Sequence, residues 1–184
     1  MKKHILLLML LCLAGCSGVN TYDTKLGQKL RLQQIDLQKW SLQGRLLIKG
    51  DDMLTANLQW QHNNDRDVLR LAGVFGLGAV LIELDEHEIV LDDGQVRRVS
   101  QDIDAFIAQQ IGFYVPLTAL RQWVLGRYME GVPLVQFENG FQQLGWRIAY
   151  NEYMDTSVGV MPHKIKVIKD NIKLKLVIDR WDIE

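Results

Sequence analysis

Apolar and polar residues alternate along most of this 184-residue chain, and this alternation restricts the possible fold more than any other feature. Trp40, Leu42, Leu46 and Ile48 occupy alternate positions, and residues 54–60 repeat the pattern. Successive side chains of a β-strand point to opposite faces, so a period of two predicts half-buried strands. Strands are expected at residues 40–48, 54–60, 68–72, 79–84, 88–91, 95–99, 134–138, 145–153, 163–168 and 172–181.

Short polar turns separate many of these strands, at residues 50–52, 63–65, 92–94 and 169–171. The pair Asp93-Gly94 is a strong hairpin signal, because both residues tolerate the positive φ of a tight turn. The chain is therefore expected to form a meander of antiparallel strands.

Three segments have helical spacing instead. Residues 24–39 predict an amphipathic helix; a second is expected to be capped by Ser100 and to end at Gly112. A third should begin at Pro116 and close at Gly126. About ten strands with two short helices between them predict a mainly β fold, one strongly curved sheet or barrel with a helical plug. An apolar concave face in such a fold must be filled by its own side chains or by a ligand.

The N-terminus has the form of an export signal. Lys2 and Lys3 precede an apolar run at residues 5–13. That run is too short to span a membrane, which takes about 20 apolar residues. It has the dimensions of a signal-peptide core.

The four residues that follow, Leu13-Ala14-Gly15-Cys16, resemble the lipobox of bacterial lipoproteins. The resemblance implies cleavage after Gly15, a diacylglycerol on the Cys16 thiol and acylation of the new amine. It divides the chain into a signal peptide (1–15), a lipidated tether (16–23) and a single domain (24–184). Ser17, in place of the Asp that retains such proteins in the inner membrane, points to the outer membrane. An ordinary secretory signal with a chance cysteine is the alternative.

Composition excludes several classes of protein. The chain has 21 basic and 22 acidic side chains, so nothing indicates a nucleic-acid-binding surface. Both cysteines fall within the first sixteen residues, which excludes a disulfide scaffold. Loss of Lys2 and Lys3 with the signal peptide would leave 19 basic and 22 acidic side chains, a net charge of −3.

Nothing in the sequence indicates an enzyme, a metal site or a cofactor. His62, His87 and His163 lack metal-ligand spacing and are expected in solvent, and no serine lies in a nucleophile elbow. The glycine-rich residues 73–78 are followed by a strand, whereas a phosphate-binding loop needs a following helix.

The same loop is unusual in another way, because Val74, Phe75 and Leu77 are apolar. They either cover the core or form an exposed finger that enters a membrane or a partner's cavity. Several large aromatic residues pose a similar choice between core packing and the wall or lid of a cavity for acyl chains. They are Trp40, Trp60, Phe106, Trp123 and Trp146.

Several segments together resemble the LolB family of outer-membrane lipoproteins. They are residues 40–46, the strand ending at Trp60, 76–78 with 82–84, 115–117 with 120–126, 145–150, 161–162, and 173–176 with Trp181. The resemblance implies an incomplete antiparallel β-barrel with short helices that lid an apolar cavity, as in the soluble carrier LolA.

The resemblance also implies a function. The protein would be a monomer on the periplasmic face of the outer membrane. It would accept acylated lipoproteins from LolA and insert them into the inner leaflet of that membrane. Leu77 matches the exposed leucine that the family needs for insertion. Gly76 stands where a Pro is common, so either Phe75 or Leu77 forms the tip of the loop.

Three other functions stay open. A lipid-anchored module for other apolar ligands would share the barrel and differ only in what it binds. A structural outer-membrane lipoprotein would have a packed interior without a cavity. A hydrolase would need a convergent Ser, His and acid, and ranks last.

Overall fold

The computed structural model describes residues 37–73, 78–112 and 114–184. The predicted signal peptide, the tether and most of the 24–39 helix lie outside these ranges. Within them, Leu37 and Gln38 are not helical and Lys39 begins the first strand, so the helix prediction is wrong at its C-terminal end. The reason is strand pairing, since Lys39 faces Asn63 of the next strand.

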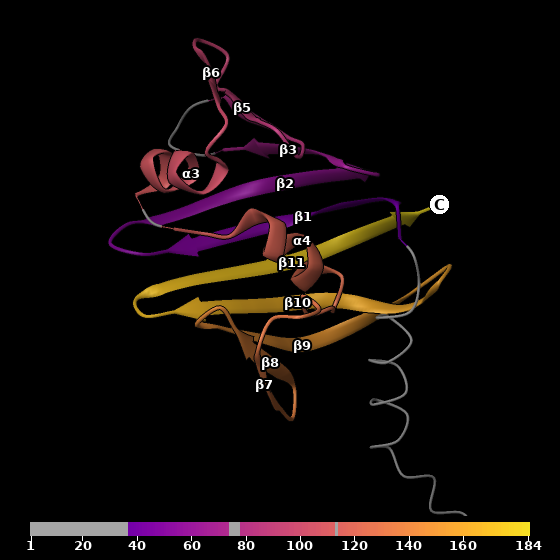
Figure 1. Ribbon diagram of the computed structural model, residues 1–184. Coiled ribbons are helices and arrows are strands. Elements are labelled where there is room, and N and C mark those ends of the chain that lie inside the picture. Colours follow the sequence, from indigo (N-terminus) through magenta and orange to yellow (C-terminus); the bar gives the residue numbers. More distant parts are fainter. Residues whose placement is uncertain (1–36, 74–77, 113) are drawn as a thin grey trace, which may run out of the picture.

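The described residues form eleven strands in one antiparallel sheet (Figure 1). The strands are β1 (Lys39–Lys49), β2 (Met53–Asn63), β3 (Arg66–Ala72), β4 (Ala79–Leu84), β5 (Ile89–Asp92), β6 (Arg97–Ser100), β7 (Leu134–Phe137), β8 (Gly140–Gln143), β9 (Trp146–Thr156), β10 (Gly159–Lys169) and β11 (Ile172–Ile183). Their order is β6-β5-β4-β3-β2-β1-β11-β10-β9-β8-β7, so the first and last strands pair in the middle. The sheet is open, with β6 and β7 as its edges, which agrees with the predicted incomplete barrel.

The alternation that predicted the strands is preserved in their burial. In β2, Ala56, Leu58 and Trp60 are buried and the residues between them are exposed. β1 pairs with β2 over eleven consecutive residues, and its pairing with β11 shifts register between Gln43 and Gly44. One face of the central strands therefore builds the core.

Among the strands and their turns, two features differ from the sequence prediction. Strand β8 was not predicted, because four residues that begin with a glycine are too short to show a period. The predicted tight hairpin at 92–94 has a longer loop, since Asp92 pairs with Arg97. The Asp93 carboxylate accepts hydrogen bonds from the backbone N–H groups of Gln95 and Val96, and this side-chain turn accommodates the extra residues.

Helices α3 (Ile103–Ile111) and α4 (Leu117–Val124) connect the two halves of the sheet in sequence and cover one of its faces (Figure 1). The N-cap of α3 is Asp102, whose carboxylate accepts from the Ala105 N–H at 3.0 Å. Ser100, the predicted cap, instead accepts from the Asp102 N–H. Gly112 ends α3 in the left-handed conformation, as predicted. Pro116 precedes α4 as predicted, and that helix ends at Val124, two residues before Gly126.

Candidate functional site

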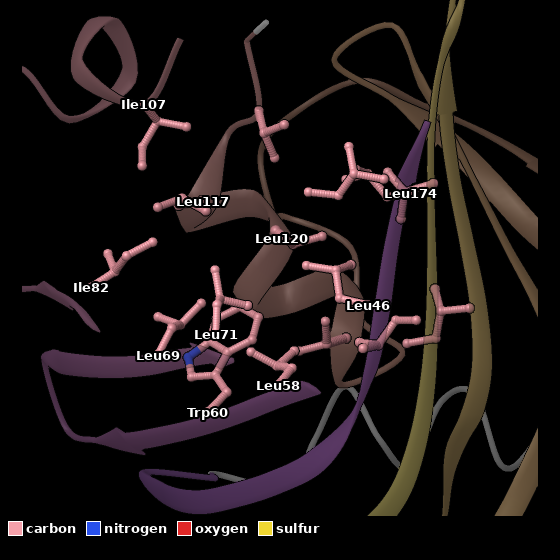
Figure 2. Close-up of a pocket in the computed structure, with 16 residues that line it drawn as sticks. Leu46, Leu58, Trp60, Leu69, Leu71, Ile82, Ile107, Leu117, Leu120 and Leu174 are labelled. Carbon is pink, nitrogen blue, oxygen red and sulfur yellow. The ribbon is translucent and has the colours of Figure 1, made fainter. Parts of the chain in front are cut away.

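An apolar cavity lies between the helices and the sheet (Figure 2). The space among its lining residues is about 760 Å³, a volume that includes solvent at the open side of the cavity. All sixteen residues that line it are hydrophobic: Leu46, Ile48, Leu58, Trp60, Leu69, Leu71, Ile82, Ile107, Val115, Leu117, Leu120, Val124, Ile165, Val167, Leu174 and Leu176.

The two periodicities of the sequence produce this lining. Strands β1, β2, β3, β10 and β11 each contribute two residues that are two positions apart, such as Leu174 and Leu176. Helix α4 contributes Leu117, Leu120 and Val124, which share one helical face. Figure 2 shows the labelled side chains of both helices and of the strands pointing into the same space. A wall without polar specificity groups suits a flexible hydrocarbon chain.

Some lining residues are only half-buried. Leu46, Ile48, Leu71 and Leu120 belong to this group, whereas Leu58 and Trp60 are almost fully buried. Solvent therefore reaches part of the cavity wall, and an apolar ligand that covered these four side chains would remove further apolar surface from water.

A buried ion pair fastens α4 to the sheet. Arg121 of α4 pairs with the carboxylate of Asp67 in β3, which has no solvent exposure. The other Asp67 oxygen accepts the indole N–H of Trp60 at 2.8 Å and lies 3.0 Å from His62 Nδ1. A buried carboxylate needs such partners, because desolvation without them is costly. The arrangement fixes the helix and a tryptophan of the cavity wall through one side chain.

A second set of hydrogen bonds holds the end of α4. The buried hydroxyl of Tyr150 in β9 donates to the Trp123 carbonyl at 2.8 Å, and burial raises the pKa of this phenol well above its usual value. The Gln143 side chain accepts from the Met129 N–H at 2.8 Å and donates to the carbonyls of Met129 and Val132. The helix and the segment after it are thus anchored to β8 and β9.

The aromatic residues predicted for the cavity are all buried, but they are distributed differently. Trp60 lines the cavity, and the remaining four are not among its lining residues. Trp40 packs against Trp60 and Trp181, with ring centroids 5.4 and 5.7 Å away. Trp123 and Trp146 contact each other at 6.4 Å. Phe106 lies on α3 beside Ile107, which does line the cavity.

The wall is mostly aliphatic, and sequence reasoning that favoured aromatic residues missed these positions. It also missed the Asp67–Arg121 pair. His62 was predicted in solvent, but it is buried, which overturns that prediction; His87 is exposed, and His163 is half-buried. The strand period does indicate that His62 and Asp67 are buried. His62 lies two positions from Trp60, and Asp67 lies two positions from Leu69, so each is on the inward face of its strand.

The remaining predicted site residues, Cys16, Val74, Phe75 and Leu77, lie outside the described residues. Among the residues that the structure describes, no group of His, Cys, Asp and Glu is arranged to hold a metal ion. Nor does either helix of that part of the chain have the length and hydrophobicity to cross a membrane.

Known proteins share both the sequence pattern and the fold. The family described as "Outer membrane lipoprotein LolB" matches residues 38–181. Outer-membrane lipoprotein LolB of Halorhodospira halophila is 25% identical, with 95% of this chain and 92% of that protein covered. The LolB of Chromohalobacter salexigens is 29% identical, with 83% of this chain and 74% of that protein covered.

Solved structures show the same fold at much lower sequence identity. A LolA-superfamily protein of Nitrosomonas europaea superposes with a TM-score of 0.52 and 8% identity, and the match covers 88% of this chain and 93% of that one. The family match extends over nearly all of the sheet and both helices. The chain therefore belongs to the LolB family of outer-membrane lipoproteins.

Proposed function

We propose that this protein is a lipid-anchored receptor of the outer membrane that accepts the acyl chains of other lipoproteins in its cavity and transfers them to the membrane. Membership of the LolB family supports an outer-membrane lipoprotein receptor of the Lol pathway. The observation that carries the proposal is the cavity itself, whose sixteen lining residues are all hydrophobic.

The hydrophobic effect explains both why the cavity would bind acyl chains and why it would accept them from different cargo proteins. Each methylene removed from water contributes about 0.8 kcal/mol, and this contribution has no directional requirement. A wall of Leu, Ile and Val therefore accepts acyl chains that belong to different cargo proteins. Transfer from a carrier needs no nucleotide if this cavity binds the chains more favourably than the carrier does.

Anchoring of the protein and insertion of its cargo into the membrane would depend on residues that lie outside the described ranges. In the proposal, residues 1–15 are removed, Cys16 carries the acyl anchor and residues 16–23 tether the domain at the periplasmic face. The anchor keeps the receptor at high local concentration beside its target membrane. Val74, Phe75 and Leu77 enter the inner leaflet while the cargo leaves the cavity.

The donor in this scheme is a soluble periplasmic carrier of the LolA type, and the receptor acts as a monomer. This chain shares its fold with a LolA-superfamily protein. No step involves covalent chemistry by this chain. The open cavity also disfavours the alternative of a purely structural lipoprotein, because the interior of such a protein would be filled by its own side chains.

Two neighbouring leucines give a matched test. Leu46 lines the cavity and Leu47, the next residue on β1, faces the other side of the sheet; both are half-buried. In the mature chain without its acyl groups, Leu46→Glu should abolish acceptance of an acylated lipoprotein from a loaded carrier, because the carboxylate would lie in the path of the chains. Leu47→Glu should accept cargo as the parent does.

Equal acceptance by the two variants would refute the assignment of the cavity. If the parent protein retained free fatty acid but took no acylated protein from the carrier, the module for other apolar ligands would be the correct function.

A further inference from the structure

The face of the sheet that points away from the cavity carries a group of lysines. Strand residues alternate between faces, and the residues next to the cavity-lining positions of β1, β10 and β11 point the opposite way. Four of these are exposed lysines, which we call the basic face: Lys49, Lys166, Lys173 and Lys175.

The register places these lysines in directly opposed pairs. Lys166 of β10 faces Lys175 of β11, and Lys173 of β11 faces Lys49 of β1. Like charges directly opposite each other across two strands destabilise a sheet. Folding alone therefore gives no reason for this arrangement.

Two cations close to the basic face on the same strands are paired with carboxylates. Arg45 forms an ion pair with Asp179 at 3.0 Å, and Lys164 forms one with Glu152 at 2.7 Å. Within the described residues, none of the four lysines of the basic face has such a partner. Lys175 contributes a little to the lowered pKa of Glu152, a carboxylate that Lys164 already pairs, so most of the charge of the basic face is available to an external anion.

Apolar side chains lie among the lysines. Leu47 faces Lys175, and Ile168 faces Lys173, and both apolar residues are half-buried. A mixed surface of lysines and aliphatic residues suits the boundary between the headgroups and the acyl chains of a bilayer, where both kinds of side chain find partners.

Charge is segregated along the sequence as well. Residues 163–177 contain five lysines and one acidic residue, whereas residues 83–104 contain eight acidic residues and two arginines. The lysines are thus concentrated in β10 and β11, and the exposed acidic residues nearest to them in sequence are Asp170, in the turn between these strands, and Asp51 and Asp52, which follow Lys49.

We infer that the basic face docks on the anionic phospholipid headgroups of the membrane that holds this lipoprotein. Charge complementarity and membership of an outer-membrane lipoprotein family both support this partner. The position of Gly73, where the predicted insertion loop begins, agrees with this partner. A Cβ added to Gly73 would lie 3.9 Å from the carbonyl oxygen of Thr55, so the two residues are close. Thr55 faces Leu47 of the adjacent strand, which lies among the lysines. Gly73 and the basic face thus lie near the same end of the sheet.

Vesicle binding by the mature chain without its acyl groups tests the inference. The protein should bind vesicles that contain phosphatidylglycerol and not vesicles of phosphatidylcholine alone. Binding should disappear at high salt, where the Debye length falls to about 3 Å. Lys166→Gln with Lys175→Gln should weaken partitioning roughly fivefold for each lysine removed.

The matched control removes two exposed cations that are remote from the basic face along the sheet. Lys39→Gln lies at the opposite end of β1 from Lys49, and Arg97→Gln lies on the edge strand β6, so this double variant should bind almost as the parent does. Because the Lys166–Lys175 repulsion is removed, the first double variant should be at least as stable to urea as the parent, so a binding defect is not a folding defect.

Two outcomes overturn the inference: equal binding to both kinds of vesicle, or equal losses in the two double variants. Binding to soluble poly-glutamate without binding to phosphatidylglycerol vesicles would also overturn it, and would identify an acidic protein as the partner. The assay contains no acylated cargo, so its failure leaves the proposed function untouched.

Discussion

Arg121, on the helix that covers the cavity, forms an ion pair with Asp67, a fully buried carboxylate on the strand beneath it. Asp67 also receives a hydrogen bond from Trp60, which lines the cavity. The position of the helix and the shape of the cavity wall are therefore coupled through a single side chain.

Removing only one partner of this pair should be costly. Arg121→Met would leave the Asp67 charge buried and unpaired, and we expect the free energy of unfolding to fall by about 3–5 kcal/mol. The double variant Arg121→Met with Asp67→Asn should lose clearly less, because no buried charge remains. Urea denaturation of both variants measures the difference, and equal losses would show that the charge is not the cause.

Gly44 should not tolerate a side chain. A Cβ there would overlap the Val177 carbonyl oxygen of β11, and backbone atoms in the middle of a sheet move only at a cost. Gly44→Ala should reduce stability by at least the roughly 1–3 kcal/mol that is typical of overpacking. Gly78→Ala, where nothing lies within 4 Å, is the control and should unfold at nearly the parental urea concentration.

Tyr150 should make the fold sensitive to alkaline pH. Burial raises the pKa of its phenol above the usual value of 10.0, so the unfolded chain loses this proton at lower pH than the folded one. The stabilisation is complete below about pH 10 and declines as the pH rises toward the folded-state pKa.

The test compares unfolding midpoints across this range. For Tyr150→Phe, the unfolding midpoint should decline less steeply above pH 10 than it does for the parent. At every pH the free energy of unfolding should also be lower by about 1 kcal/mol, because the hydrogen bond to Trp123 is missing. Tyr153→Phe should flatten the curve less, since burial raises the pKa of that more exposed phenol too, but to a smaller extent. Identical slopes for the parent and Tyr150→Phe would contradict the prediction.

Leu77→Glu should separate acceptance from release. The cavity residues are unchanged, so the variant should take cargo from a loaded carrier, but a carboxylate is expensive to place among acyl chains and insertion into vesicles should stop. Val96→Glu changes an exposed apolar residue of another loop and should insert cargo normally. A parental insertion rate for Leu77→Glu would disprove the role assigned to this loop.

Strand periodicity predicted much of the fold because the central strands are long and have one buried face. Trp40, Leu42 and Leu46 on one strand and Ala56, Leu58 and Trp60 on the next repeat the same phase. The period carries no information about pairing between distant strands, and the adjacency of β1 and β11 could not be derived from it. The LolB resemblance provided the fold where periodicity ended.

The cavity was harder to predict than the strands. The sequence left the large aromatic residues open between core packing and the cavity wall. Trp123 and Trp146 pack against each other, and the Gln143 side chain accepts a hydrogen bond from the Trp123 indole N–H at 3.3 Å. An inward-facing strand residue lines a cavity only where no side chain of a helix fills the space opposite it. The position of the helices over the sheet is a tertiary feature, and no local sequence pattern indicates it.

The central pairing of β1 with β11 has a consequence for biogenesis. The two meanders, β1–β6 and β7–β11, consist of contacts between neighbours in sequence, but the cavity wall needs Leu46 and Leu176 from strands that meet only after nearly the whole chain is available. Such long-range closure is slow compared with hairpin formation. The apolar surface for acyl chains is thus completed last, and until then it is exposed on both halves to any other apolar surface in the compartment.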